Sequence, residues 1–173
     1  MPNRSRLVRL ALVAAIVIAP LSARAQAAAG ASQVISISPI GLLFGLLGAE
    51  YERRLAPSSS FGVSAQSYAN DDFSYLSADL KYRYYPQEKA LEGFAVGITG
   101  GVTRIGERNQ SENDSGSAVS LGFALDYQWL LGPRRNFAVI LGTGARRLIP
   151  IGTEIDGSSL TLPTARIAIG RAF

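Results

Sequence analysis

The sequence predicts an all-β fold in which eight antiparallel strands, connected up and down, close into a barrel. Three observations lead to this expectation. Apolar residues recur at every second position over most of the chain, which is the period of a strand with two different faces. No segment after residue 33 keeps a helical period over three turns. Short turn-type connections alternate with longer polar ones, so that each kind gathers at one end of an up-and-down sheet.

Residues 1–25 contain the three parts of a secretory signal peptide in the expected order. Three arginines lie within the first ten residues, residues 10–19 are uncharged, and residues 23–25 have the small-x-small pattern of a cleavage site. The apolar run is too short to cross a bilayer, which takes about 20 residues, so a retained membrane anchor is the less favoured alternative. We therefore expect cleavage after Ala25, leaving residues 26–173 as one barrel domain.

The charge of the whole chain is basic, with 17 Lys and Arg against 13 Asp and Glu. Four of the arginines belong to the signal segment, so the exported part is expected to be neutral, with 13 charges of each sign. This removes the main support for a nucleic-acid partner. The chain has no cysteine and no histidine, which excludes disulfides, thiolate metal sites, cysteine nucleophiles and Ser-His triads. We predict no cofactor, no bound metal and no catalytic residues.

The eight expected strands differ in how clearly they alternate. They cover residues 34–38, 46–55, 61–69, 75–85, 94–104, 119–131, 137–146 and 163–173. In the strand expected at 119–131, for example, Leu121, Phe123 and Leu125 share one face, and Ser120 and Gly122 share the other. The first two strands are less regular, and the glycine-rich residues 42–48 between them fit either a loop or a continuation of one of these strands.

Alternation alone fits both a soluble barrel with an apolar interior and a membrane barrel with an apolar exterior. Two features favour the membrane barrel. The strand face opposite the apolar one consists of small residues and scattered charges. The apolar face continues for about 9–11 residues, the length of a tilted membrane strand. The aromatic residues of the apolar face also gather at the short-turn end, as in an interfacial girdle. They are Tyr51, Phe61, Tyr82, Tyr84, Phe94, Tyr127, Trp129, Phe137 and Phe173. The alternative is a soluble periplasmic or secreted barrel, like the lipocalins, that binds a small apolar ligand.

The strand faces opposite the apolar ones carry charges of both signs. They are Glu50, Glu52, Arg54, Asp79, Lys81, Arg83, Asp126, Arg146 and Arg166. Inside a barrel of this width such charges must pair, because isolated charges would be poorly solvated. We expect them to form a salt-bridged plug; a narrow pathway for small solutes is the alternative. The known outer-membrane barrel enzymes depend on a histidine, which this chain lacks, so we do not expect an enzyme.

Several of these features together resemble a known class of proteins. The signal peptide, the eight amphipathic strands, the alternating connections and the final residues 166–173 resemble small outer-membrane β-barrels of the OmpA transmembrane-domain and OmpW types. Ile167, Ile169 and Phe173 resemble the C-terminal signal that the outer-membrane insertion machinery recognises. The resemblance implies a Gram-negative outer membrane, contact with its lipid and lipopolysaccharide, and periplasmic chaperones and the insertion machinery as transient partners. The role it implies is structural or in surface interaction.

Overall fold

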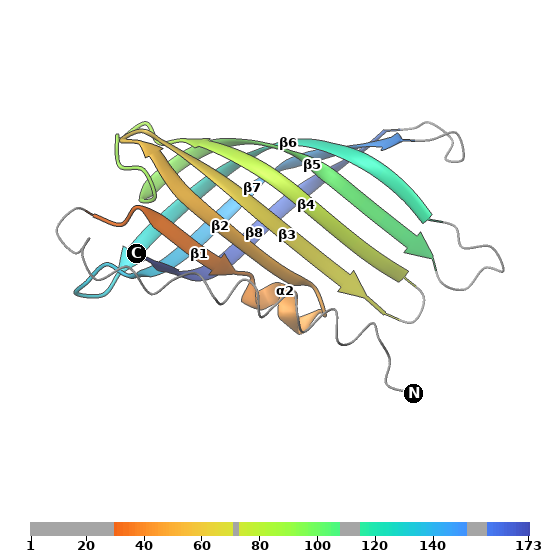
Figure 1. Cartoon of the computed structure of the whole chain (residues 1–173), viewed down its shortest axis with the longest axis horizontal. Coiled ribbons are helices and arrows are strands. Elements are labelled where there is room, and N and C mark those ends of the chain that lie inside the picture. Colours follow the sequence, from red (N-terminus) through yellow and green to blue (C-terminus); the bar gives the residue numbers. More distant parts are fainter. Residues whose placement is uncertain (1–29, 71–72, 108–114, 152–158) are drawn as a thin grey trace. The chain divides into compact units, whose positions relative to one another are not determined.

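The computed structural model describes residues 30–70, 73–107, 115–151 and 159–173. These residues form a closed barrel of eight antiparallel strands, each paired with its neighbours in chain order, and β8 pairs with β1 to close it (Figure 1). The strands are β1 (Gln33–Ile37), β2 (Leu47–Ala56), β3 (Ser59–Ala69), β4 (Phe73–Tyr84), β5 (Gly93–Glu107), β6 (Ser115–Leu131), β7 (Phe137–Ile151) and β8 (Leu160–Ala172). The predicted fold class is confirmed. The expected signal peptide, with its cleavage after Ala25, lies outside the described residues.

The strands are staggered around the barrel. Moving from Ser36 on β1 to its cross-strand partner on β2, Glu50, and then from strand to strand in the same way leads to Leu160 on β8. Across the β1–β8 seam, however, Ser36 pairs with Gly170. The offset from residue 160 to residue 170 is the shear of the barrel. With eight strands at the usual spacings, this stagger corresponds to a strand tilt of about 40°.

One short helix, α2 (Pro39–Leu43), follows β1. The sequence left this stretch open between loop and strand and did not predict a helix, because one turn is too short to display a helical period. The helix begins at a proline, whose fixed φ suits the first helical position. It ends at Leu43; Gly45, two residues later, has a φ of 76°, and the Leu46 amide donates to the Gly41 carbonyl oxygen at 2.8 Å. Within the described ranges, no helix is long and apolar enough to cross a membrane.

Several strands extend beyond their expected ends toward the long connections. β5 reaches Glu107 and β7 reaches Ile151, whereas the sequence predicted strands that end near Arg104 and Arg146. The added residues include Gly106, which pairs with Ser115. The sequence did not predict this extension, because glycine, serine and proline are typical of loops. Backbone pairing continues wherever a partner strand is present, regardless of side-chain polarity.

The connection between β4 and β5, residues 85–92, folds over the short-turn end of the barrel. Its Leu91 is fully buried and packs in one cluster with Val34, Ala138 and Ala172, which lie on β1, β7 and β8. The Tyr85 amide donates to the Ser58 carbonyl oxygen at 2.8 Å, which joins this connection to the β2–β3 turn. This end of the barrel is therefore closed by an apolar cap.

Candidate functional site: the charged lumen

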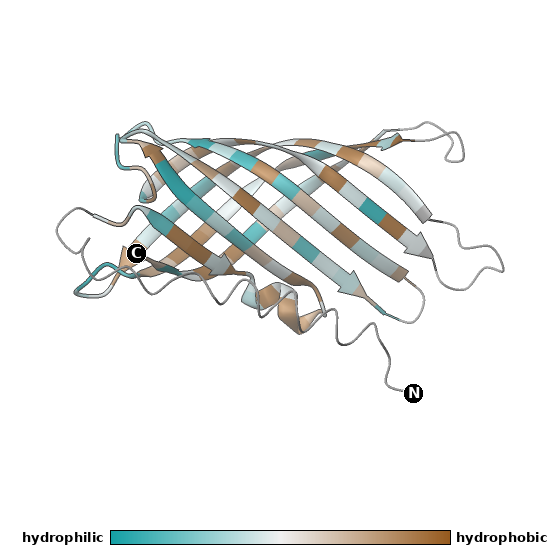
Figure 2. Cartoon of the chain, in the orientation of Figure 1, coloured by the Kyte–Doolittle hydropathy of each residue, from teal (hydrophilic) through white to brown (hydrophobic). Residues whose placement is uncertain are grey.

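Charged and apolar side chains have exchanged the positions they occupy in a soluble globular protein. Glu52 and Arg83, which face the interior, are 1% and 3% exposed, whereas Leu80 and Ile98, which face outward, are 56% and 65% exposed. Figure 2 shows this pattern as polar and apolar bands that alternate along the strands. The barrel therefore has a polar interior and an apolar outer surface.

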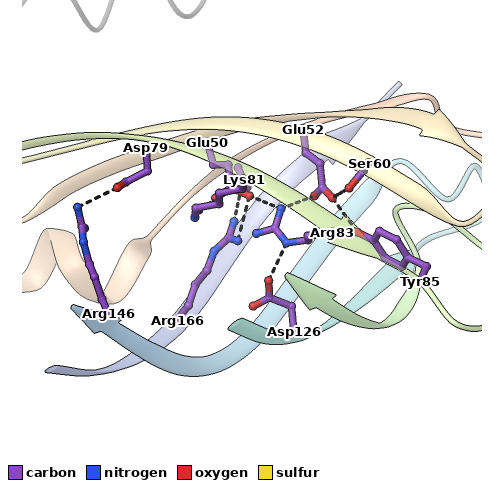
Figure 3. Close-up of polar contacts among 11 residues, drawn as sticks. Glu50, Glu52, Ser60, Asp79, Lys81, Arg83, Tyr85, Asp126, Arg146 and Arg166 are labelled. Atoms are coloured by element: carbon purple, nitrogen blue, oxygen red, sulfur yellow. Dashed lines mark hydrogen bonds and ion pairs between the residues drawn. The ribbon is translucent and has the colours of Figure 1, made fainter. Parts of the chain in front are cut away.

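Arg83 on β4 is the centre of the interior charge network (Figure 3). Its Nη1 lies 2.8 Å from Glu50 Oε1 and 3.1 Å from Glu52 Oε2, both on β2. These Nη1 contacts are ion pairs without hydrogen-bond alignment, whereas Nε donates a hydrogen bond of 2.7 Å to Asp126 Oδ2 on β6. One guanidinium thus joins three strands that are not neighbours in the barrel.

Two further cations complete this network around Glu50. Arg166 Nη1 on β8 lies 3.0 Å from Glu50 Oε1, and Arg166 Nη2 donates to Ser36 Oγ at 3.1 Å. Lys81 donates to Glu50 Oε2. The network contains three carboxylates and three cations, so its formal charge is zero. This balance allows it to be buried, because each charge has a partner of opposite sign.

A second ion pair lies closer to the long-connection end. Arg146 Nη2 on β7 is 2.8 Å from Asp79 Oδ1 on β4. The same nitrogen lies 2.8 Å from both Ser120 Oγ and Thr103 Oγ1, and Nη1 donates to Tyr75 Oη at 3.2 Å. This pair spans β4 to β7 and is held by hydroxyl groups of intervening strands.

Small residues on the interior faces make room for these charges. A Cβ atom at Gly142 would overlap Asp126 Oδ1, and one at Gly101 would overlap both Asp79 Oδ1 and the Ala78 carbonyl oxygen. Each of these two carboxylates therefore lies over a glycine of another strand. The close approach explains why the face opposite the apolar one is rich in glycine at these positions.

Tyr85, which follows β4, connects the charge network to the apolar cap. Its Oη donates to Glu52 Oε1 at 2.7 Å, and Ser60 Oγ donates to the same oxygen. Burial raises the pKa of the Tyr85 phenol well above its ordinary value, and the neighbouring negative charge of Glu52 raises the pKa further. Tyr85 therefore remains a neutral hydrogen-bond donor.

The structure thus brings eight of the nine sequence-predicted lumen charges into two networks. The ninth, Arg54, faces the same side of β2 as Glu50 and Glu52 but donates to the Ala31 carbonyl oxygen. In the described part of the chain it joins neither network, because this backbone acceptor lies within its reach near the short-turn end. The sequence did not indicate this separation, nor did it indicate the cap, although Ala90 and Leu91 are apolar residues in a polar connection.

The nine aromatic residues of the expected girdle occupy the alternate positions that face outward, toward the short-turn end of the barrel. Phe61 is registered opposite Tyr82, and Phe94 opposite Tyr127. The rings of Tyr127 and Trp129 are 4.5 Å apart between centroids. The others are Tyr51, Tyr84, Phe137 and Phe173. That these rings mark a membrane interface stays a prediction.

The residues of the expected assembly signal lie on and beside β8. Ile167 is 41% exposed, and Ile169 is registered opposite Ile37 on β1. Phe173 follows the strand, and its backbone exchanges two hydrogen bonds of 2.9 Å with Gln33. Phe173 therefore pairs with the residue that begins β1, and recognition of these side chains by other proteins stays a prediction.

Beyond the charge network, toward the long-connection end, the interior is not filled. A cavity of about 380 Å³ reaches from Lys81, Arg146 and Arg166 to Leu46 and Leu162. Within the described residues, no group of three or more Asp, Glu, His or Cys side chains is placed to hold a metal ion.

Together these features define a closed, eight-stranded antiparallel barrel with a charged lumen and an apolar exterior. No family model and no curated protein matches the chain. Among solved structures, the chain is similar to the crystal structure of the N-terminal β-barrel domain of Pseudomonas aeruginosa OprF. The two are 17% identical with a TM-score of 0.49, and the alignment covers 83% of this chain and 99% of that one.

Proposed function

We propose that this chain is an integral outer-membrane β-barrel of a Gram-negative bacterium, with a structural or surface-interaction role and no enzymatic activity. The observation that carries the proposal is the inverted polarity of the barrel. Leu76, Ile98, Val102, Leu121 and Phe123 are each more than half exposed on the outer wall. An apolar surface of this extent on a protein in water would be a site of association or aggregation, whereas in a bilayer it contacts acyl chains.

The proposed orientation places the short turns and the C-terminal end of β8 in the periplasm and the long connections outside the cell. The aromatic residues then lie at the inner interface, where amphipathic rings are favoured. The lipid and lipopolysaccharide of the outer membrane surround the wall. Periplasmic chaperones would deliver the unfolded chain, and the insertion machinery would recognise Ile167, Ile169 and Phe173. This orientation rests on connection length and the aromatic positions.

We further propose that the lumen does not conduct solutes. The networks of Arg83 and Arg146 cross the interior, and Leu91 of the cap fills its short-turn end. Recordings in planar bilayers should therefore detect no steady single-channel current. A steady current that disappears when the lumen is narrowed beside Arg83, as in Gly97→Val, would instead establish the narrow-pore alternative. At Gly97 an added Cβ would lie 3.2 Å from Arg83 Cγ.

Cell fractionation with a gel-mobility assay tests the proposed location. We expect the protein in the outer-membrane fraction, and we expect unboiled samples to migrate differently from boiled ones because the barrel stays folded in detergent. Recovery of a folded protein from the periplasm without detergent would contradict the proposal and favour the soluble, lipocalin-like alternative. A soluble barrel of that kind turns its apolar side chains inward and leaves its charges in water.

A further inference from the structure

The seam that closes the barrel is paired over only part of its length. β1 pairs with four residues of β8, from Val34 opposite Ala172 to Ile37 opposite Ile169. The preceding part of β8, residues 160–168, has no strand on this side among the described residues. The exchange of hydrogen bonds between Phe173 and Gln33 shows that odd-numbered residues of β8 direct their backbone groups toward this side. Pro163, which has no N–H, is one of them, as expected at an unpaired edge.

The short helix α2 lies where the seam opens. Figure 1 shows it beyond the end of β1, beside the barrel wall and short of the end at which β5 and β7 finish and β6 begins. Ser38 Oγ, just before the helix, donates to the Ile167 carbonyl oxygen at 3.2 Å. Leu43 and Phe44 are 82% and 73% exposed and offer the bilayer an apolar surface at this point. The wall here is therefore a helix and a strand edge without a continuous hydrogen-bonded ladder.

The cavity of about 380 Å³ lies directly behind this part of the wall, and both edges of the seam line it. Ile37, Ser38 and Leu46 contribute from the β1 and α2 side, and residues 162–166 contribute from β8. Its volume falls within the range of small-molecule sites, which is roughly 300–1,000 Å³. One boundary of the cavity is thus the part of the wall that lacks a continuous strand ladder.

The charged residues that line this cavity are four cations and three carboxylates, namely Lys81, Arg83, Arg146, Arg166, Glu50, Asp79 and Asp126. The side chains of Lys81, Arg146 and Arg166 are 14%, 14% and 20% exposed, whereas those of Glu50 and Asp79 are each 5% exposed. These three cations are thus more exposed than the two carboxylates, and the buried Arg146 Nε has no hydrogen-bond partner among the described residues. An anionic group in the cavity would therefore meet positive charge first.

We infer that this cavity binds a single-chain anionic amphiphile, such as a long-chain fatty acid, which enters through the seam between β8 and α2. Its head group pairs with Arg146 and Arg166, and its chain lies along Leu46 and Leu162 and passes between the strand edge and the helix into the bilayer. A small soluble anion would match the arginines but not the apolar edges, whereas an amphiphile matches both. The inference rests on the proposed membrane location, because the acyl chain of the ligand must extend into lipid.

Binding is tested with the full barrel in phosphatidylcholine nanodiscs, using the fluorescent fatty acid dansyl-undecanoic acid as the probe and empty nanodiscs as the blank. We expect saturable binding to the barrel, displaced by palmitate and not by hexadecanol, its neutral counterpart. Equal displacement by hexadecanol would overturn the proposed role of the arginines. A barrel that inserts and shows only the partitioning seen with empty nanodiscs would overturn the inference but leave the proposed function intact. A chain that fails to insert would overturn both.

A matched pair of glycine variants tests the position of the site. Gly48 faces the cavity, and a Cβ there would have its nearest atoms at 3.6 and 3.8 Å, so Gly48→Leu fits and occupies the space beside the seam. Gly100 is on the outward face with similar room, at 3.6 and 3.9 Å, so Gly100→Leu adds the same side chain to the outer wall. We expect Gly48→Leu to weaken probe binding at least about tenfold, equivalent to about 1.4 kcal/mol, and Gly100→Leu to leave it unchanged.

Each variant is first checked for folding by its mobility in unboiled samples. Should Gly48→Leu not fold, Thr164→Leu replaces it, because Thr164 lines the same cavity from β8 and is exposed. A cavity-filling variant that folds and binds the probe as tightly as the wild type would overturn the assignment of the site.

Discussion

Arg83 and Asp126 meet at 2.7 Å across the interior of the barrel, from strands β4 and β6, between which β5 lies. The two side chains meet over β5, where Gly97 leaves room for Arg83, and their contact takes the place of the apolar packing that fills most protein cores. Arginine suits this position, since its planar guanidinium can serve Asp126, Glu50 and Glu52 at the same time. Pairs of opposite charge consequently stabilise the interior, and the loss of one charged side chain should destabilise the barrel.

Arg83→Gln should be strongly destabilising. It removes the cation that faces three carboxylates and leaves those carboxylates buried with less compensation. Breaking a buried pair by removing one partner costs roughly 3–5 kcal/mol, and we expect a loss of this size in the free energy of unfolding. Urea unfolding of the barrel in phosphatidylcholine vesicles, followed by Trp129 emission, measures it.

Arg135→Gln is the matched control for this substitution. Arg135 pairs with Glu92 in the connections at the short-turn end, and its side chain is 55% exposed. Exposed ion pairs contribute about 0–1 kcal/mol, so this variant should unfold nearly as the wild type does. Equal losses in the two variants would contradict the special position of Arg83.

Gly101→Ala should be destabilising while Gly100→Ala is tolerated. A methyl group at position 101 would overlap the Ala78 carbonyl oxygen and Asp79 Oδ1, whereas at position 100 its nearest atom would be 3.6 Å away. Overpacking a fitted interior costs typically about 1–3 kcal/mol. The yield of the fast-migrating folded form on unboiled gels and the urea midpoint compare the two. A reversed order would show that the interior faces are assigned to the wrong residues.

Arginine on the outer wall should destabilise the barrel in a depth-dependent way. Leu125 lies four residues from Trp129 on the same face, which is about 10 Å along the membrane normal for a strand tilted by about 40°. We expect Leu125→Arg to cost about 2–4 kcal/mol and Leu131→Arg, near the short-turn end, about 0–1 kcal/mol. Unfolding measurements in vesicles test this difference. On a soluble barrel the two substitutions would both be harmless.

Tyr85→Phe should weaken the connection between the cap and the charge network. The substitution removes the hydrogen bond to Glu52 Oε1 and keeps the buried ring. A hydrogen bond to a charged group contributes about 1.5–3 kcal/mol, which is the expected loss in the free energy of unfolding. Tyr84→Phe is the control, because Tyr84 is 49% exposed on the outer face. If the two variants have the same free energy of unfolding, the proposed contribution of Tyr85 to the network is contradicted.

Strand alternation predicted much of this structure, because a period of two assigns every residue of a strand to one face. Once Leu121, Phe123 and Leu125 are placed outward, Ser120 and Asp126 must face inward. The same reasoning predicted that Glu50, Arg83 and Arg166 share the interior. It could not predict which of them pair, because the partners depend on the stagger of ten residues around the closed barrel.

The features that sequence reasoning missed depend on contacts between distant residues. The α2 helix is a single turn whose place is set by the early end of β1, and residues 39–48 show no period that would indicate it. The cap depends on Leu91 meeting Val34, Ala138 and Ala172, which are far apart in the sequence. The separation of Arg54 depends on where the Ala31 carbonyl lies. None of these follows from local pattern.

The contact between the outward apolar face and lipid is the central claim, and Trp129, the one tryptophan of the chain, reports on it directly. Its fluorescence is measured in vesicles of phosphatidylcholine brominated either near the head group or near the chain end. A Trp129→Phe/Leu125→Trp variant provides a deeper probe on the same face. We expect Trp129 to be quenched more by the shallow bromines and the tryptophan at position 125 more by the deep ones. Emission that neither lipid quenches at either position, from a barrel that is folded, would contradict the claim.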